Sequence, residues 1–258
     1  MLTGALVLAA IAADFEVRRV FSFGLSSQEV LLLNPLKVST KMDIESTVLA
    51  IKRAEQVLDT AYFGLKVLRA GDPSERSAGL RNVLVFGRSV TFVIQNLRSI
   101  VGEARFDGWY SPLQDQMRAD PLMRYFVEAR NNLEKQGRLD VAVSASINSF
   151  SGSDFAKLEK PPFESTSFFM GDQNGGSGWE LDLGGGESIK YYISIPKSIG
   201  EVRQVFHGLP ENIPLELRDL SVDELCGIYL GKLTDLLKAT KKEFLLGPKE
   251  RPYLRLVK

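Results

Sequence analysis

Six consecutive residues, Arg130-Asn131-Asn132-Leu133-Glu134-Lys135, form the local cluster with the strongest chemical character in this sequence. A guanidinium such as that of Arg130 can hold a phosphate through two parallel hydrogen bonds, with the Asn131 amide and the Lys135 ammonium as further donors. The opposing interpretation is structural, because an arginine often pairs with a glutamate one helical turn later and such pairs are weak at a surface. The sequence leaves both interpretations open.

An α-helix must position this cluster, because the apolar residues around it recur at helical spacing. The stripe consists of Leu122, Phe126, Ala129 and Leu133. Within the stretch from Pro112 to Gly137, Pro121 predicts a kink or a fresh helix start, and Gly137 predicts the helix end. Arg130 borders the apolar stripe, so we expect it to be only partly free of the core.

The cluster resembles the signature of the HEPN superfamily, which is Arg, then four to six residues of which the first is usually Asn, Asp or His, then His. Arg130 and Asn131 match its opening, whereas Lys135, Gln136 and Gly137 stand where the histidine would be. The resemblance implies a helical bundle that often dimerises, and metal-free RNA cleavage by Arg and His in active members. We expect no catalysis here, because a lysine with a pKa of about 10.4 is a poor proton shuttle at neutral pH.

Three further helices are predicted from apolar spacing, over residues 43–70, 77–101 and 221–246. The last begins with a capping box formed by Ser221 and Glu224. Gly87 is predicted to let a neighbouring helix approach closely. Residues 102–108 are predicted as a turn, and Trp109 and Tyr110 as aromatic residues that fill the core rather than as a stacking platform for a base.

After Gly137 the apolar period changes from 3.6 to 2, which predicts strands. These lie at 139–148, 179–183 and 189–195, with a weaker candidate at 168–170. The glycine-rich stretch 171–178 is interpreted as a hairpin loop, since it lacks the Lys-Ser/Thr ending of a P-loop. Residues 196–220 are predicted as a connection in which His207 has a structural or surface role.

The predicted fold class is therefore mainly α with a small β insertion, as a four-helix HEPN-like bundle with an antiparallel hairpin or sheet between helices three and four. The helical domain covers residues 43–247, with the insertion at about 138–196. Residues 1–42 are an N-terminal extension, for which Met42 is an alternative native start. Residues 248–258 form a basic tail.

The amino-acid composition of the chain argues against several classes of function. Lys plus Arg equals Asp plus Glu at 32 each, so no overall charge recruits nucleic acid. One cysteine and one histidine exclude a disulfide framework and a Cys/His zinc site, and we expect no metal and no cofactor. The apolar run at residues 1–13 is too short to span a bilayer. The expectation is a cytoplasmic protein without membrane contact.

The leading functional expectation is a non-catalytic binding or assembly protein, linked through the family resemblance to prokaryotic defence or toxin–antitoxin systems. Its partners would be a second copy of the chain and RNA or a nucleotide, with Arg88, Arg130 and Lys135 as nucleic-acid-binding candidates; the sequence identifies no protein partner. One alternative is a metal-independent ribonuclease that uses Arg130, Asn131 and Lys135. Another is a purely structural interaction module that uses the β insertion.

Overall fold

The computed structural model describes residues 27–149 and 151–246, and the side chains from residue 43 onward within these ranges. The described chain is mainly helical with a small antiparallel β region, as predicted. Its helices are α2 (Ser27–Ala70), α3 (Arg76–Gln95), α4 (Leu97–Val101), α5 (Glu103–Ala119), α6 (Pro121–Gln136), α7 (Leu215–Arg218) and α8 (Val222–Phe244).

The chain divides into two compact units, residues 1–49 and residues 50–258. The boundary expected between residues 42 and 43 falls inside α2, which already begins at Ser27. Residues 1–26 and the basic tail lie outside the described residues.

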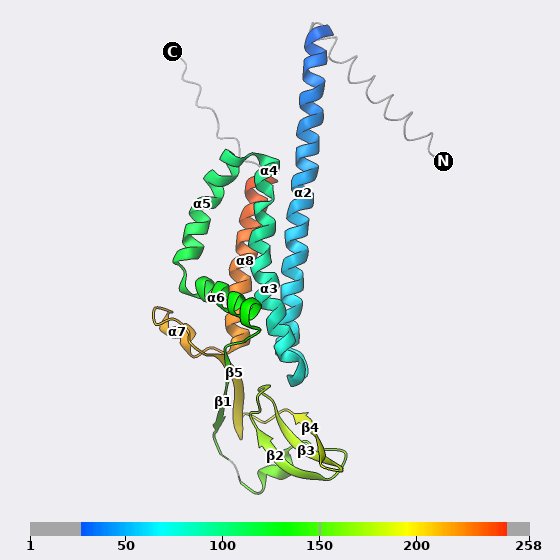
Figure 1. Cartoon of the computed structure of the whole chain (residues 1–258), viewed down its shortest axis with the longest axis vertical. Coiled ribbons are helices and arrows are strands. Elements are labelled where there is room, and N and C mark those ends of the chain that lie inside the picture. The colour runs from blue at the N-terminus through cyan, green and yellow to red at the C-terminus, as the bar shows by residue number, and fades with distance from the viewer. Residues whose placement is uncertain (1–26, 150, 247–258) are drawn as a thin grey trace, which may run out of the picture. The chain divides into compact units, whose positions relative to one another are not determined.

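Within the second unit, the part of α2 after residue 49 runs beside α3 and α8, α5 lies along their flank, and α6 crosses them (Figure 1). The apolar stripes predicted on these helices face one another. Side chains that are almost fully buried between them include Ala54, Leu84, Leu122, Phe126, Leu225 and Leu233. The inward side of α6 is therefore the Leu122–Leu133 stripe, as predicted.

The predicted helix ends of α6 and α8 are confirmed. Ser221 accepts from the Glu224 backbone while the Glu224 side chain accepts from the Ser221 backbone, which is a complete capping box. Gly137 ends α6 in the left-handed conformation, with φ of 68°. Pro121 starts α6 as a new helix. The preceding residue, Asp120, has an extended backbone that separates α6 from α5.

The turn predicted over residues 102–108 is wrong, because α5 begins at Glu103 and runs through this range. Gly102 alone makes the turn, with φ of 91°. The helix continues past Gly108 because Phe106 and Tyr110, four residues apart, are both buried and stack with ring centroids 5.1 Å apart. The prediction that Tyr110 fills the core is confirmed.

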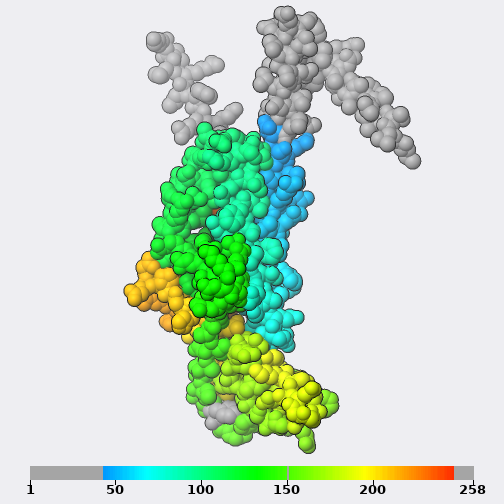
Figure 2. Space-filling model, viewed as in Figure 1, coloured from blue at the N-terminus to red at the C-terminus, as the bar shows by residue number. Residues whose placement is uncertain are grey.

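Two separate antiparallel sheets replace the single β insertion that was expected. β1 (Val141–Ile147) pairs with β5 (Gly200–Phe206), whereas β2 (Ser165–Met170), β3 (Ser177–Gly184) and β4 (Glu187–Ile193) form a three-stranded meander. The stretch 196–220, predicted as a connection, thus contains β5 and α7. β5 was not predicted because its apolar residues do not alternate with polar ones: Val202 and Val205 are three residues apart, with Arg203 and Gln204 between them. The strands form a lobe at one end of the second unit (Figure 2).

The glycine-rich stretch is a hairpin loop between β2 and β3, as predicted, and Asp172 organises it. One Asp172 carboxylate oxygen accepts from the backbone of Asn174 and Gly176, both at 3.0 Å. The other accepts from Tyr192 at 2.8 Å and from Lys190 at 2.9 Å. The loop is therefore held by a buried carboxylate with four donors.

Gly87 has the packing role that its position in the helix predicted. A Cβ atom added at Gly87 would lie 2.5 Å from Cε1 of Tyr229 on α8. On its other face, the Tyr229 ring stacks on Phe126 of α6, with centroids 4.1 Å apart and ring planes at 5°. The missing side chain of Gly87 thus allows α3, α6 and α8 to meet around one buried ring.

We expect Gly87→Ala to lower the free energy of unfolding by about 1–3 kcal/mol, because the added methyl group overpacks against Tyr229. Denaturant unfolding followed by circular dichroism measures this. Gly108→Ala is the matched control, since nothing lies within 4 Å of the added Cβ there. It should leave stability unchanged or raise it slightly. Equal effects of the two substitutions would contradict the packing role.

Candidate anion-binding site

The Arg130 guanidinium is already engaged by its own helix. It forms an ion pair with Glu134 at 2.6 Å and donates to the Asn131 amide oxygen at 3.2 Å. The Arg130 side chain is 24% exposed, and its Nε is buried without a hydrogen-bond partner among the described residues. The structural interpretation of the Arg130–Glu134 spacing is the one observed.

The other members of the predicted constellation lie elsewhere. Lys135 is exposed, and five residues along an α-helix place it about 140° around α6 from Arg130. The single histidine of the chain, His207, meets α6 through its carbonyl, which accepts from Tyr125 at 3.2 Å. Tyr125 lies about 140° from Arg130 around α6. Neither Lys135 nor His207 therefore supplies a proton shuttle beside Arg130.

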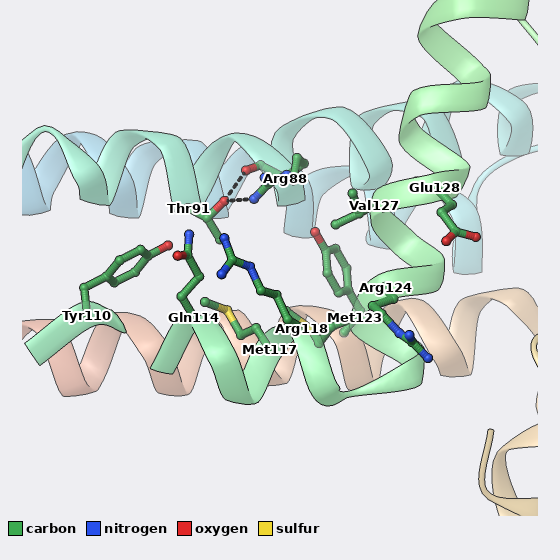
Figure 3. A pocket seen from close by; sticks show the side chains of 11 residues that line it. Arg88, Thr91, Tyr110, Gln114, Met117, Arg118, Met123, Arg124, Val127 and Glu128 are labelled. Carbon is green, nitrogen blue, oxygen red and sulfur yellow. Dashed lines mark hydrogen bonds between the residues drawn. The ribbon is translucent and has the colours of Figure 1, made fainter. Parts of the chain in front are cut away.

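A different arrangement appears between α3, α5, α6 and α8, where a cavity of about 270 Å³ opens to the surface (Figure 3). We call it the arginine pocket. It is lined by Arg88, Thr91, Tyr110, Gln114, Met117, Arg118, Met123, Arg124, Val127, Glu128 and Tyr229. Of the sequence-predicted nucleic-acid-binding residues, Arg88 lines this pocket, whereas Arg130 and Lys135 do not.

The lining contains three arginines and one carboxylate, so the pocket is electropositive although the whole chain is neutral. Arg88 is half-buried, donates to the Thr91 hydroxyl, and lies 4.3 Å from the centre of the Phe92 ring. Arg118 has only a weak pairing with exposed Asp115, at 3.4 Å, and extends across the pocket in Figure 3. Within the described part of the chain, Arg124 has no ion-pair partner.

The lining of the arginine pocket also includes uncharged hydrogen-bond donors. Tyr229 is 2% exposed, and burial raises the pKa of its hydroxyl, so it stays protonated at neutral pH. Burial likewise raises the pKa of Tyr110, against smaller opposing effects of Arg88, Gln95 and Arg118. For residues 43–149 and 151–246, neither the Tyr229 hydroxyl nor the Gln114 amide has a hydrogen-bond partner. These two groups are therefore donors without a protein acceptor among the described residues.

Asp120 holds α5 and α6, which form two sides of this pocket, against α8, which forms a third side. It caps α6 by accepting from the backbone of Leu122 and Met123, at 2.9 and 3.1 Å. Its second oxygen accepts from Lys232 of α8 at 2.6 Å. Burial raises the pKa of Asp120, but the Lys232 and backbone hydrogen bonds outweigh it and hold the pKa below its usual value. The corner between α5 and α6 is therefore fastened to α8.

Sequence reasoning missed Arg118, Arg124 and Gln114. Arg118 and Arg124 flank the Asp120-Pro121 break, which sends α5 and α6 in different directions. The signal in the sequence was one arginine on each side of a helix break. The sequence pattern does not show that Arg88 lines the same cavity.

The described ranges contain neither a metal-binding cluster nor a membrane-spanning helix. No group of three or more His, Cys, Asp or Glu side chains there is arranged to hold a metal ion. None of the helices described is both long enough and apolar enough to cross a membrane.

Comparisons with known proteins give one similarity. A family model described as bacteriophage lambda protein ea47 matches residues 66–156, a stretch that contains every pocket-lining residue except Tyr229. Protein ea47 of Escherichia phage lambda is 38% identical over 72 residues, which is 27% of this chain and 17% of that protein. The matched part thus spans about a sixth of the phage protein's length. No solved structure matches the chain.

We expect Asp120→Ala to lower the free energy of unfolding by about 0.5–2 kcal/mol through the lost helix cap. Asp120→Asn keeps an acceptor for the cap and removes the charge. Because the folded-state pKa of Asp120 is lowered, its charge stabilises the fold above the usual aspartate pKa, about 3.9, and this contribution disappears as the pH falls further.

Denaturant unfolding from pH 7 to pH 3 measures how much the helix cap and the Asp120 charge contribute to the free energy of unfolding. Both variants are compared with the unchanged chain. The stability gap between the unchanged chain and Asp120→Asn should shrink below about pH 4. A gap that stays constant over this range would show that the Asp120 charge contributes nothing.

Proposed function

We propose that this chain is a non-catalytic, HEPN-like binding or assembly protein, and that its ligand is RNA or a nucleotide whose phosphate is held in the arginine pocket. The observation that carries the proposal is that Arg88, Arg118 and Arg124 line one cavity, and that Glu128 is the one carboxylate in that lining. Guanidinium groups bind phosphate oxygens with short, charge-assisted hydrogen bonds. A pocket in which Arg88 and Arg124 have no carboxylate partner among the described residues suits an anionic ligand better than a neutral one.

The non-catalytic part of the proposal rests on Arg130. Cleavage of RNA by attack of the 2′-hydroxyl needs a group that accepts or donates a proton near neutral pH. The ionisable side chain beside the Arg130 guanidinium is Glu134, which is held in an ion pair with it, and Lys135 lies about 140° away around α6.

The family assignment and its setting remain part of the proposal. A mainly helical chain with a β region between α6 and α8 is compatible with a HEPN-like bundle. The similarity of residues 66–156 to a phage protein is compatible with a role in systems that act between phage and bacterium, such as defence or toxin–antitoxin pairs. We also propose a cytoplasmic location, where such ligands occur.

Binding is testable with a short single-stranded RNA that carries a 5′-phosphate and a fluorophore at its 3′ end. Fluorescence anisotropy should show saturable binding, and Arg118→Gln or Arg124→Gln should each raise the Kd about tenfold or more, because hydrogen bonds to charged groups contribute about 1.5–3 kcal/mol. Arg53→Gln is the matched control, since Arg53 is exposed on α2 and does not line the pocket.

The same samples test the absence of cleavage. Incubation of the purified chain with the labelled RNA should leave it at full length on a denaturing gel. Cleavage that disappears in Arg130→Ala and in Lys135→Gln would overturn the non-catalytic assignment and support the ribonuclease alternative.

A homodimer is the assembly that the family resemblance implies. The proposed contact runs through α3 and α6, and Phe92 on α3 supports it, because this large apolar side chain is 46% exposed. Light scattering coupled to size exclusion should give twice the monomer mass, and Phe92→Asp should shift it to the monomer. A strict monomer at micromolar concentration would refute the dimer.

A further inference from the structure

Resting on the proposed function, we infer that the arginine pocket recognises the terminal phosphomonoester of a single nucleotide, and not the phosphodiester backbone of a nucleic acid. Its ligand class is then a nucleoside monophosphate or a phosphorylated RNA end. The charge, the size and the neutral donors of the pocket each lead to this class.

The charge of the lining matches a monoester. Arg88, Arg118 and Arg124 against Glu128 leave an excess of two positive charges. A phosphomonoester carries about 1.5 to 2 negative charges at pH 7 and offers three acceptor oxygens. A phosphodiester carries one negative charge and two free oxygens, so it would leave one guanidinium without a partner.

The dimensions of the pocket favour one nucleotide. Its volume of about 270 Å³ lies just below the range of about 300–1,000 Å³ that is usual for small-ligand sites. Met117, Met123 and Val127 give it an apolar wall beside the arginines, and methionine side chains adapt to the face of a sugar or a base. A polymer would need a groove that continues past both ends of the site.

Polar groups of the wall supply further contacts for the same ligand. The buried Tyr229 hydroxyl can donate to a phosphate oxygen, and the Gln114 amide can pair with a base edge or a ribose hydroxyl. Glu128 is exposed at the edge of the pocket on α6, one turn after Arg124. Its negative charge repels a second phosphate at this edge and thus disfavours a continuing strand.

Isothermal titration calorimetry of the full chain tests this inference with three probes: adenosine 5′-monophosphate, adenosine, and the dinucleoside monophosphate ApA. We expect adenosine 5′-monophosphate to bind at least about tenfold more tightly than either other probe, since only it offers a dianionic group to several guanidiniums. Arg118→Gln should abolish this preference, whereas Arg53→Gln should preserve it.

Tyr229→Phe keeps the ring that packs between Gly87 and Phe126 and removes only the hydroxyl, so its effect separates recognition from folding. It should weaken the binding of adenosine 5′-monophosphate several-fold while thermal unfolding stays unchanged. If both Arg118→Gln and Tyr229→Phe bind adenosine 5′-monophosphate as tightly as the unchanged chain, the site lies elsewhere and the inference is overturned.

The outcomes separate this inference from the proposed function. If ApA and RNA with a 5′-hydroxyl bind as tightly as the monoester and depend on Arg118, the pocket binds nucleic acid in general, and only the monoester preference is refuted. If neither the mononucleotide nor any RNA binds, both proposals fall together.

Discussion

Contact between the Tyr229 ring and the bare backbone of Gly87 is the constraint on which most of this structure depends. The ring fills the space that a side chain on α3 would take, and Phe126 covers its other face. This one arrangement brings α8 back to α3 and α6, which are far from it in sequence. Because the same tyrosine closes the back of the arginine pocket, the packing of the core and the shape of the candidate site have a common origin.

Charge is distributed unevenly in a chain that is neutral overall. Ion pairs neutralise many of the arginines, as Glu134 does for Arg130 and Asp223 does for Arg69. In the arginine pocket, Arg88 and Arg124 find no carboxylate partner among the described residues, as is also true of arginines outside it such as Arg53 and Arg81. Like charges gathered around one cavity destabilise a fold unless an anion joins them, so such a cluster is more readily explained by ligand binding than by stability.

The β strands are joined to the helices by contacts of a different kind. Arg76 at the start of α3 donates to the Gly175 carbonyl at 2.6 Å, and the loop that presents this carbonyl is held by Asp172. Phe206 at the end of β5 packs edge-on against Tyr125 of α6, with ring centroids 5.1 Å apart. The strands thus contact α6 close to its pocket-lining residues, but they do not contribute residues to the pocket themselves.

Local physical chemistry in the sequence determined the helix-forming stripes, the capping box at Ser221 and the break at Pro121, because each depends on residues within a few turns of one another. It also exposed the Arg130–Glu134 spacing that keeps Arg130 engaged. Gly87 was predicted as a point of close approach, but its partner Tyr229 lies far along the chain on α8. Only the tertiary structure decided that β5 pairs with β1, and that Arg88, Arg118 and Arg124 share a cavity. Those relationships join segments whose separation is set by the packing of whole helices, and no linear period encodes the direction in which one helix leaves another.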